Sequence, residues 1–283
     1  MHASSLTMLR ELALIATGFV GYMVVRGFAR AERGGALDHG RDLLAFERSL
    51  GIDWERGIQR WALNHDALMN VANAVYAWSY WPILIGTLVY LWYRDRGRYV
   101  YFRNAMFVSG ALGLVVFSLY PVAPPRMLEG FTDTVSEGSR HLFVDQAKDL
   151  INPYAALPSF HSGWFVLAGV VLLMTARQRW SRVALVVAIP VMPLTVVLTA
   201  NHYLVDVVLG VTLSIGALLL AMRTQPAVLS LRDTSNHAPT LGVVTAARSN
   251  PVVVVDLTHG SPAVAVRVAS DCEATEASVQ RSV

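Results

Sequence analysis

The sequence is poor in charged residues, and it contains a single lysine and a single cysteine. Asp, Glu, Lys and Arg together make up only 15% of its 283 residues, whereas a soluble domain usually carries about 25%. Hydrophobic residues make up 54%, and the mean hydropathy is +0.44. This composition argues against a soluble protein and predicts a polytopic membrane protein. The lone Cys272 excludes an intramolecular disulfide and a cysteine-rich metal site.

The distribution of the basic residues argues against nucleic-acid binding. The net charge is +3 and the sequence pI is about 9.2, values that alone could suggest a nucleic-acid partner. The arginines, however, form short clusters between apolar runs, which is typical of the loops of membrane proteins. We therefore expect no nucleic-acid partner.

Six apolar segments come close to the roughly 20 residues that a helix needs to cross a bilayer. They cover residues 12–29, 67–93, 104–122, 160–176, 183–200 and 203–222. The sequence therefore predicts an all-α fold, a polytopic membrane helix bundle with about six transmembrane helices. Pro190 and Pro193 lie inside the fifth segment and predict a kink there.

The N-terminal part, residues 1–64, leaves two questions open. Residues 1–31 are either a retained transmembrane helix or a cleaved secretory signal, because a short apolar core and an Ala-Arg-Ala site fit both interpretations. The stretch from Ala36 to Leu50 predicts an amphipathic helix, and Asp53 is placed to cap a second short helix. These two helices lie in the membrane interface or form a small packing element.

The remaining chain divides at about residue 222. Residues 65–222 hold the other five apolar segments and every motif described below, so we expect a membrane domain there. From Arg223 onward the apolar periodicity ends. A segment of this kind cannot bury enough apolar surface to fold alone, so residues 223–283 are expected to form a cytoplasmic tail of low order.

Two arginine clusters indicate the orientation in the membrane. The connection after the second segment contains Arg94, Arg96, Arg98 and Arg103, and the connection after the fourth contains Arg177, Arg179 and Arg182. The loop before the second segment also holds many arginines, although its acidic residues are comparably numerous. The positive-inside rule places both connections in the cytoplasm. The opposite loops, which carry the motifs described next, then face outward, and we expect a multi-pass plasma-membrane protein with its site on the outer face.

His202 and Asp206 are four residues apart at the start of the sixth segment. On a helix this spacing places both side chains on one face, where the carboxylate can hold the imidazole. Titratable groups beside a membrane segment are costly to bury and usually functional. A structural hydrogen-bonded pair is the alternative interpretation.

His161 lies in the run Pro158-Ser-Phe-His-Ser-Gly163 at the start of the fourth segment. Ser159 and Ser162 can bond to phosphate oxygens, Gly163 permits a close approach, and the free N–H groups of a helix start attract an anion. A histidine at a helix start can also be only a cap or a packed side chain. The surrounding serines and glycine favour an anion site.

Arg126 follows two prolines that end the third segment. It is expected at the same membrane face as the two histidines, where its guanidinium group matches the geometry of a phosphate. An arginine that only anchors the helix at the interface is the alternative. Together, the three motifs favour phosphoryl transfer through a phosphohistidine.

In this order, the Pro-Pro-Arg, Pro-Ser-x-His-Ser-Gly and Asn-His-x3-Asp motifs resemble those of the type 2 phosphatidic acid phosphatase superfamily. More narrowly, they are similar to the branch of fungal inositol phosphorylceramide synthase, the inositolphosphotransferase-like enzymes. The resemblance covers about residues 65–220 and implies a six-helix catalytic core that requires no metal or other cofactor. It also implies that His202 is the nucleophile, that Asp206 orients it, and that His161 is the acid that protonates the leaving group.

The chain departs from the common phosphatase pattern at two cation positions. Leu119 stands where the pattern has a lysine, and Thr195-Val196 stands where it has Ser-Arg. Asn201, Arg140 and Lys148 are candidate additions to the phosphate site. A site for a dianionic monoester needs more positive charge than a site for a monoanionic diester. The sequence therefore predicts a lipid-linked phosphate or phosphodiester as the substrate. The loss of two cations favours transfer of a phosphorylated headgroup over hydrolysis of a monoester.

Two other classes of function remain open. One is a transporter or proton-relay membrane protein in which the buried His and Asp residues carry protons, although such proteins often show repeat symmetry and broken helices. The other is a zinc hydrolase that uses His161, His202 and Asp206, although the chain has no His-Glu-x-x-His motif. The sequence does not identify the lipid, the acceptor or the oligomeric state.

Overall fold

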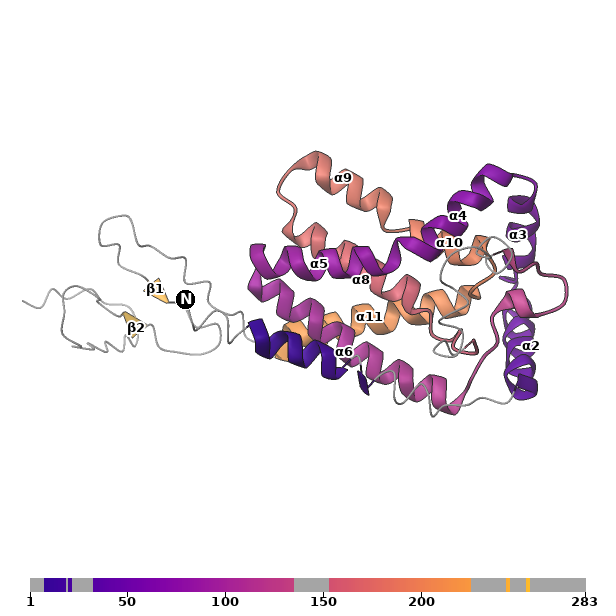
Figure 1. Cartoon of the computed structure of the whole chain (residues 1–283), viewed down its shortest axis with the longest axis horizontal. Helices are drawn as coiled ribbons and strands as arrows, with labels where there is room; N and C mark the ends of the chain where they lie inside the picture. Colours follow the sequence, from indigo (N-terminus) through magenta and orange to yellow (C-terminus); the bar gives the residue numbers. More distant parts are fainter. Residues whose placement is uncertain are drawn as a thin grey trace, which may run out of the picture. The chain divides into compact units, whose positions relative to one another are not determined.

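The described part of the chain is built almost entirely from helices, which confirms the predicted all-α membrane bundle (Figure 1). In this computed structural model the described residues are 8–18, 20–21, 33–134, 153–224, 243–244 and 253–254. The chain divides into two units, residues 1–228 and 229–283. In the second unit Val243–Val244 (β1) pairs antiparallel with Val253–Val254 (β2). The low order expected of residues 223–283 stays a prediction.

The first unit contains the helices. Residues 8–18 and 20–21 are helical. The following elements are α2 (Arg33–Ser49), α3 (Glu55–Leu63), α4 (Asp66–Trp78), α5 (Tyr80–Arg94), α6 (Arg96–Leu119), the 3-10 helix η1 (Pro125–Met127), α8 (Phe160–Thr175), α9 (Arg179–Ala188), α10 (Val191–Leu198) and α11 (Leu204–Thr224).

Five of the six predicted segments coincide with helices, and two of them are divided. The second segment is α4 followed by α5, with a bend of 49° between them. The fifth is α9 followed by α10, separated at Ile189-Pro190 as the kink prediction implied. Within the described residues, α6, the run Arg179–Leu198 and α11 are each long and apolar enough to cross a membrane, and α4 with α5 qualifies as a bent pair.

The fourth and the first segments do not reach the length of a membrane span within the described residues. The fourth is α8, an apolar helix of 16 residues. The first predicted segment continues into residues 22–29, which lie outside the described part.

α6 begins eight residues earlier than expected, because the side chain of Asp95 caps it by accepting a hydrogen bond from the backbone N–H of Arg98.

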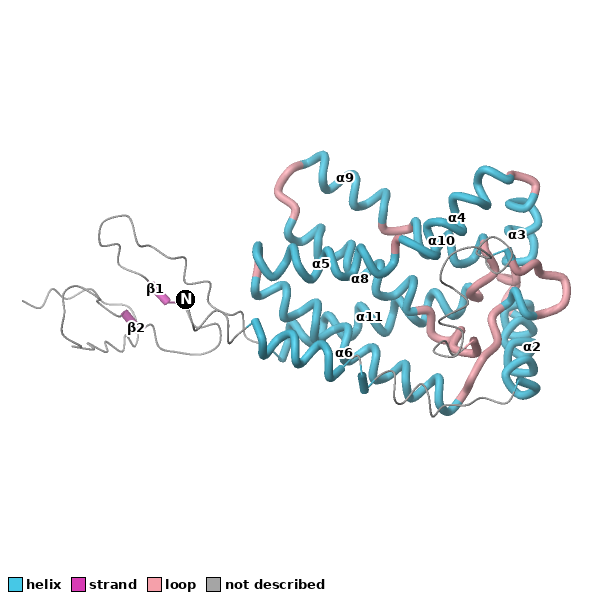
Figure 2. The backbone as a smooth tube through the Cα atoms, viewed as in Figure 1, coloured by secondary structure: helices cyan, strands magenta, loops and turns pink. Residues whose placement is uncertain are grey.

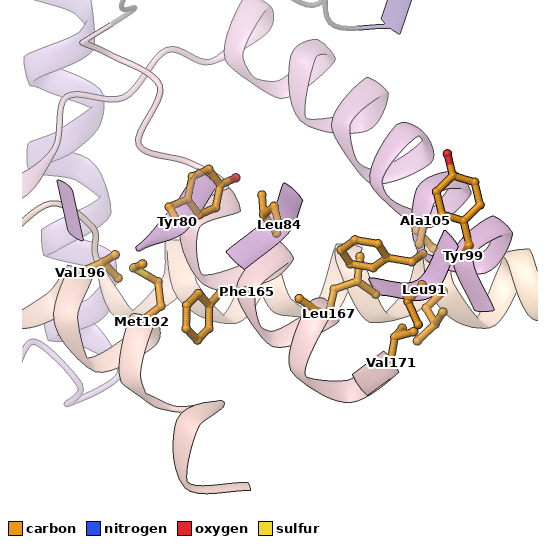
Figure 3. Close-up of a cluster of buried hydrophobic side chains, with 14 of the residues drawn as sticks. Tyr80, Leu84, Leu91, Tyr99, Ala105, Phe165, Leu167, Val171, Met192 and Val196 are labelled. Atoms are coloured by element: carbon orange, nitrogen blue, oxygen red, sulfur yellow. The ribbon is translucent and has the colours of Figure 1, made fainter. Parts of the chain in front are cut away.

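The apolar core lies between α5, α6, α8, α10 and α11. Figure 3 shows this cluster extending from Met192 and Val196 at one end to Leu91 and Tyr99 at the other. Because lipid tails are as apolar as these side chains, close van der Waals packing rather than removal from water holds such a bundle together in a membrane. The core holds the helices that carry the motifs in fixed relation to one another.

Glycines let α8 and α11 approach each other at the end that carries the motifs. A Cβ atom on Gly163 would come closer than 3.0 Å to the backbone of Gly210, and one on Gly210 would come equally close to the backbone of Ser159. In addition, the backbone N–H of Ser159 donates to the carbonyl of Asp206 at 3.0 Å. These contacts fix the start of α8 against the start of α11.

α2 lies across the end of the bundle, with α3 beside it (Figure 1). The predicted amphipathic helix is confirmed, and its Leu43 and Leu44 pack against Tyr203 and neighbouring apolar residues. This packing favours the interpretation of a packing element. The prediction that Asp53 caps α3 is wrong: the N-cap is Trp54, and Asp53 accepts a hydrogen bond from Arg48 at 3.2 Å.

Candidate functional site

The predicted motifs meet at one end of the bundle, beside α2 and α3. Figure 2 shows the loops that lead into α8 and α11 lying together at this end. The connections that carry the two arginine clusters, α5 to α6 and α8 to α9, lie at the opposite end (Figure 1). These two arginine clusters therefore lie away from the histidine motifs, whereas α2 and α3, at the motif end, also carry several arginines, balanced by acidic residues.

A tight turn between α10 and α11 holds His202. Ala200 has a φ of 52° in this turn, a left-handed conformation that is unfavourable for a residue with a Cβ atom. The carbonyl of Val196 accepts hydrogen bonds from the backbone N–H groups of Asn201 at 2.8 Å and His202 at 3.2 Å. The turn therefore holds His202 at the end of α10 through hydrogen bonds from backbone N–H groups.

Two acceptors fix the ring of His202. Nδ1 lies 2.8 Å from the carbonyl oxygen of Ala156 and 3.3 Å from Oδ2 of Asp206. Because both neighbours are acceptors, Nδ1 carries the proton and Nε2 keeps its lone pair. Burial, together with the positive charge of Arg126, lowers the pKa of His202 to about 3. The neutral imidazole has the protonation state of a nucleophile.

Asp206 lies in the first turn of α11 and is fully buried. Its Oδ2 accepts a hydrogen bond from the backbone N–H of Tyr203 at 3.0 Å in addition to facing His202. The carboxylate is therefore in place to orient the imidazole, but the shorter contact comes from the carbonyl of Ala156. Backbone acceptors leave no residue-type signal, so sequence motifs did not reveal this partner.

His161 is the second residue of α8, and its ring centroid lies 5.8 Å from that of His202. Its ring packs against Tyr76 and Tyr80, with centroids 4.8 Å and 4.5 Å away. The side chain is partly exposed. The structure thus brings the two histidines together. The two tyrosines were not among the predicted site residues. Tyr76 lies near the end of α4 and Tyr80 begins α5, so the bend between these helices brings both rings to His161.

Ser159, Ser162 and Gly163 form the buried start of α8. The Oγ atom of Ser159 caps the helix by accepting from the backbone N–H of Ser162 at 3.3 Å, and it donates to Oγ of Ser162 at 3.2 Å. Gly163 lies against α11, which gives it a packing role. A role for these three residues in phosphate binding stays a prediction.

Arg126 lies beside the histidines in the 3-10 helix η1. Its backbone N–H donates to the carbonyl of Ala200 at 2.8 Å, and its guanidinium donates to the side chain of Asn201. Its Nε atom lies 3.6 Å from a carboxylate oxygen of Asp133. These bonds to Ala200 and Asn201 attach Arg126 to the turn that carries His202.

The cation positions of the common phosphatase pattern are apolar in space as well as in sequence. Leu119 is 78% exposed at the end of α6, and Val196 is completely buried in α10. Two candidate substitutes, Arg140 and Lys148, lie outside the described residues. In the described part of the site, Arg126 is the cation that contacts the motif residues.

The described residues do not contain three His, Cys, Asp or Glu side chains placed to hold a metal ion. Asp206 faces the Nδ1 atom of His202, and the ring centroids of His202 and His161 are 5.8 Å apart. The geometry is that of a hydrogen-bonded His202–Asp206 pair with a second histidine nearby.

Comparison with known proteins identifies the family to which the chain belongs. Phosphoinositol dihydroceramide synthase from Bacteroides thetaiotaomicron is 24% identical over 193 residues, which cover 60% of this chain and 63% of the relative. The chain therefore spans less than two thirds of that relative's length. No solved structure gives a significant match. The profile of the PAP2 superfamily matches residues 41–220, which include every motif described above, and the chain belongs to this superfamily.

Proposed function

We propose that the protein is a membrane-embedded phosphotransferase that moves a phosphorylated headgroup from a lipid phosphodiester to an alcohol through a phosphohistidine at His202. The observation that carries the proposal is the state of the His202 ring. Its Nδ1 is held by Ala156 and Asp206, so its Nε2 is the nucleophilic atom, and His161 lies on a neighbouring helix start with a centroid separation of 5.8 Å.

In the first step Nε2 of His202 attacks the phosphorus atom, and the bond from phosphorus to the leaving oxygen breaks. Protonated His161 gives its proton to that oxygen, so the leaving group departs as a neutral alcohol. In the second step the neutral His161 takes the proton of the acceptor hydroxyl. The acceptor oxygen bonds to phosphorus, and His202 is released in its starting state.

Arg126 stabilises the equatorial phosphate oxygens in both steps, a role for which its guanidinium group is suited. Asn201 holds that guanidinium from the turn that also carries His202. With Leu119 and Val196 in place of two cations, the site suits a substrate with one negative charge on phosphorus. The name of the relative, phosphoinositol dihydroceramide synthase, fits headgroup transfer between lipids.

We also propose that the site faces the outer side of the plasma membrane. The arginine clusters at the α5–α6 and α8–α9 connections lie at the end of the bundle away from the histidines (Figure 1). The positive-inside rule then places the motifs outside and the C-terminal residues in the cytoplasm.

The experiment that tests the proposal compares two lipids with the purified full-length protein in lipid nanodiscs. Phosphatidylinositol and phosphatidic acid are each supplied with and without an alcohol acceptor, and His202→Ala serves as the control. We expect turnover of the diester that depends on the acceptor. Efficient hydrolysis of phosphatidic acid without diester turnover would instead show a monoester phosphatase.

A further inference from the structure

Two helices outside the predicted motifs each place one buried glutamate on the start of α11. Oε1 of Glu47, from α2, accepts a hydrogen bond from the backbone N–H of Val205 at 2.7 Å. Oε1 of Glu55, from α3, accepts from the backbone N–H of Leu204 at 2.8 Å. Both side chains are completely buried. The first N–H groups of a helix have no partner within the helix, so these bonds fix where α11 begins.

The N–H groups that the two glutamates bind lie between the residues proposed to carry out the reaction. His202 immediately precedes the bonded segment, and Asp206 immediately follows it. Asp206 completes the set by accepting from the backbone N–H of Tyr203. Three carboxyl groups from three helices therefore hold three successive N–H groups, and the position of His202 depends on all of them.

Three adjacent buried carboxylates would repel one another strongly unless at least one of them carried a proton. Glu47 and Glu55 accept from successive N–H groups of α11, so their carboxyl groups lie close together in the protein interior. No donor in the described part of the chain reaches the Oε2 atom of either residue, which leaves both atoms available to a proton held between them. Burial, the contact with Glu55 and the charge of Asp206 raise the pKa of Glu47 to about 9.

A close approach of α2 makes this arrangement possible. A Cβ atom on Gly40 would lie 2.7 Å from the hydroxyl of Tyr203 and 2.9 Å from the carbonyl oxygen of Ala123. That hydroxyl donates to the same carbonyl at 2.9 Å. Only a glycine at this position lets α2 bring Glu47 to the start of α11 without displacing the hydrogen bond.

We infer that Glu47 and Glu55 are positioning residues, an acid pair that shares one proton and holds the start of α11 so that His202 and Asp206 keep their working geometry. This inference rests on the proposed function of His202. The glutamates act through the backbone of α11 and touch neither substrate nor the imidazole.

The shared proton gives the pair a pH dependence of known sign. The titratable groups that act on Glu47 are Glu55 from α3 and Asp206 from α11, and the phenol of Tyr203 lies among the same charges. Because the pKa of Glu47 is raised in the folded protein, its stabilising contribution is complete below its ordinary value of 4.5 and is lost as the pH rises through about 9. Above that pH two buried negative charges face each other.

The test uses two substitutions of Glu47 in the full-length protein. In Glu47→Gln the amide oxygen still accepts from Val205 and the amide N–H₂ still donates to Glu55, so the variant imitates the protonated pair. Glu47→Leu removes both bonds. We expect Glu47→Gln to keep kcat within about threefold at neutral pH, and Glu47→Leu to lose more than about tenfold in kcat with little change in KM, since small displacements of catalytic groups cost large factors in rate.

A direct measurement of the proton separates this inference from the proposed function. Infrared spectroscopy of the wild-type protein should show a protonated carboxyl band at neutral pH that disappears near pH 9, and Glu47→Gln should lack it. The exposed Glu129→Gln is the matched control and should keep the band. The melting temperature of Glu47→Gln should also fall less between pH 7 and pH 10 than that of the wild type.

Each result has a defined meaning, independent of which lipid the enzyme uses. The same carboxyl band in wild type and Glu47→Gln would overturn the shared proton. Equal loss of kcat in Glu47→Gln and Glu47→Leu, in folded protein, would overturn the positioning role. If the band behaves as expected while His202→Ala keeps full activity, the acid pair stands and the proposed chemistry of His202 fails.

Discussion

His161 and His202 face each other from the starts of two different helices, with their ring centroids 5.8 Å apart. Gly163 and Gly210 allow this, because they let α8 and α11 pack with backbone against backbone at that end. The two histidine rings have different surroundings. His202 is buried and held by acceptors, whereas His161 is partly exposed and packed between Tyr76 and Tyr80.

The first prediction concerns His161 as the acid. His161→Ala should slow the turnover of a lipid phosphodiester by about 10²–10⁴-fold, the usual contribution of a general acid. A substrate with a good leaving group, such as a nitrophenyl phosphodiester, needs no protonation and should lose far less. Equal losses with both substrates would exclude the acid role. Stopped-flow measurement of nitrophenol release provides the comparison.

The second prediction concerns Arg126. Arg126→Gln should lower kcat/KM by about 10²–10³-fold, the range found when one group that stabilises developing charge is removed. Because the Arg126 charge helps to lower the pKa of His202, the acid limb of the pH–kcat/KM profile should also move to higher pH. Asp133→Asn keeps the shape of the second partner of Arg126 and serves as the control. An unmoved acid limb in Arg126→Gln would contradict the assignment.

The third prediction concerns the packing of α8 on α11. Gly210→Ala should destabilise the protein by about 1–3 kcal/mol, the usual cost of overpacking, because its Cβ atom would meet the backbone of Ser159. Gly216→Ala on the same helix meets nothing within 4 Å and should be neutral or stabilise by about 0.5–1 kcal/mol. Thermal unfolding in detergent measures both. Equal melting temperatures would mean that the contact at Gly210 is not tight.

The fourth prediction concerns orientation. In a Cys272→Ser background, cysteine at the exposed Glu129 should react with an impermeant thiol reagent in intact cells, because it lies at the end of the bundle that carries the histidines. Cysteine at the exposed Gln178, in the α8–α9 connection, should react only after the cells are lysed. The opposite pattern would place the site in the cytoplasm.

Sequence patterns alone predicted the helical bundle and the grouping of the three motifs. Long apolar segments identify helices whatever their neighbours are, and His202 with Asp206 is a spacing that a helix converts into proximity. The two prolines indicated where the fifth segment divides, but the division at Ser79 was not predicted, since apolarity continues across it without a proline or glycine at that position.

The residues that the motifs did not include act through tertiary contacts. The carbonyl of Ala156 holds His202, and no side-chain type marks such a role. Glu47 offered a weak signal, because an acid three and four residues after Leu44 and Leu43 shares the apolar face of the amphipathic helix. Its hydrogen-bond partner Val205, at the start of α11, is 158 residues away in the sequence, so no local pattern indicates the contact.

The most direct test of the account is the trapping of the covalent intermediate. The full-length protein is mixed with a phosphodiester labelled in its phosphorylated headgroup, quenched in alkali, which preserves a phosphorus–nitrogen bond, and mapped by mass spectrometry. We expect a labelled histidine at position 202 in the wild type, and in His161→Ala when the leaving group is activated. We expect no label in His202→Ala. Label retained in folded His202→Ala protein would show that His202 is not the nucleophile.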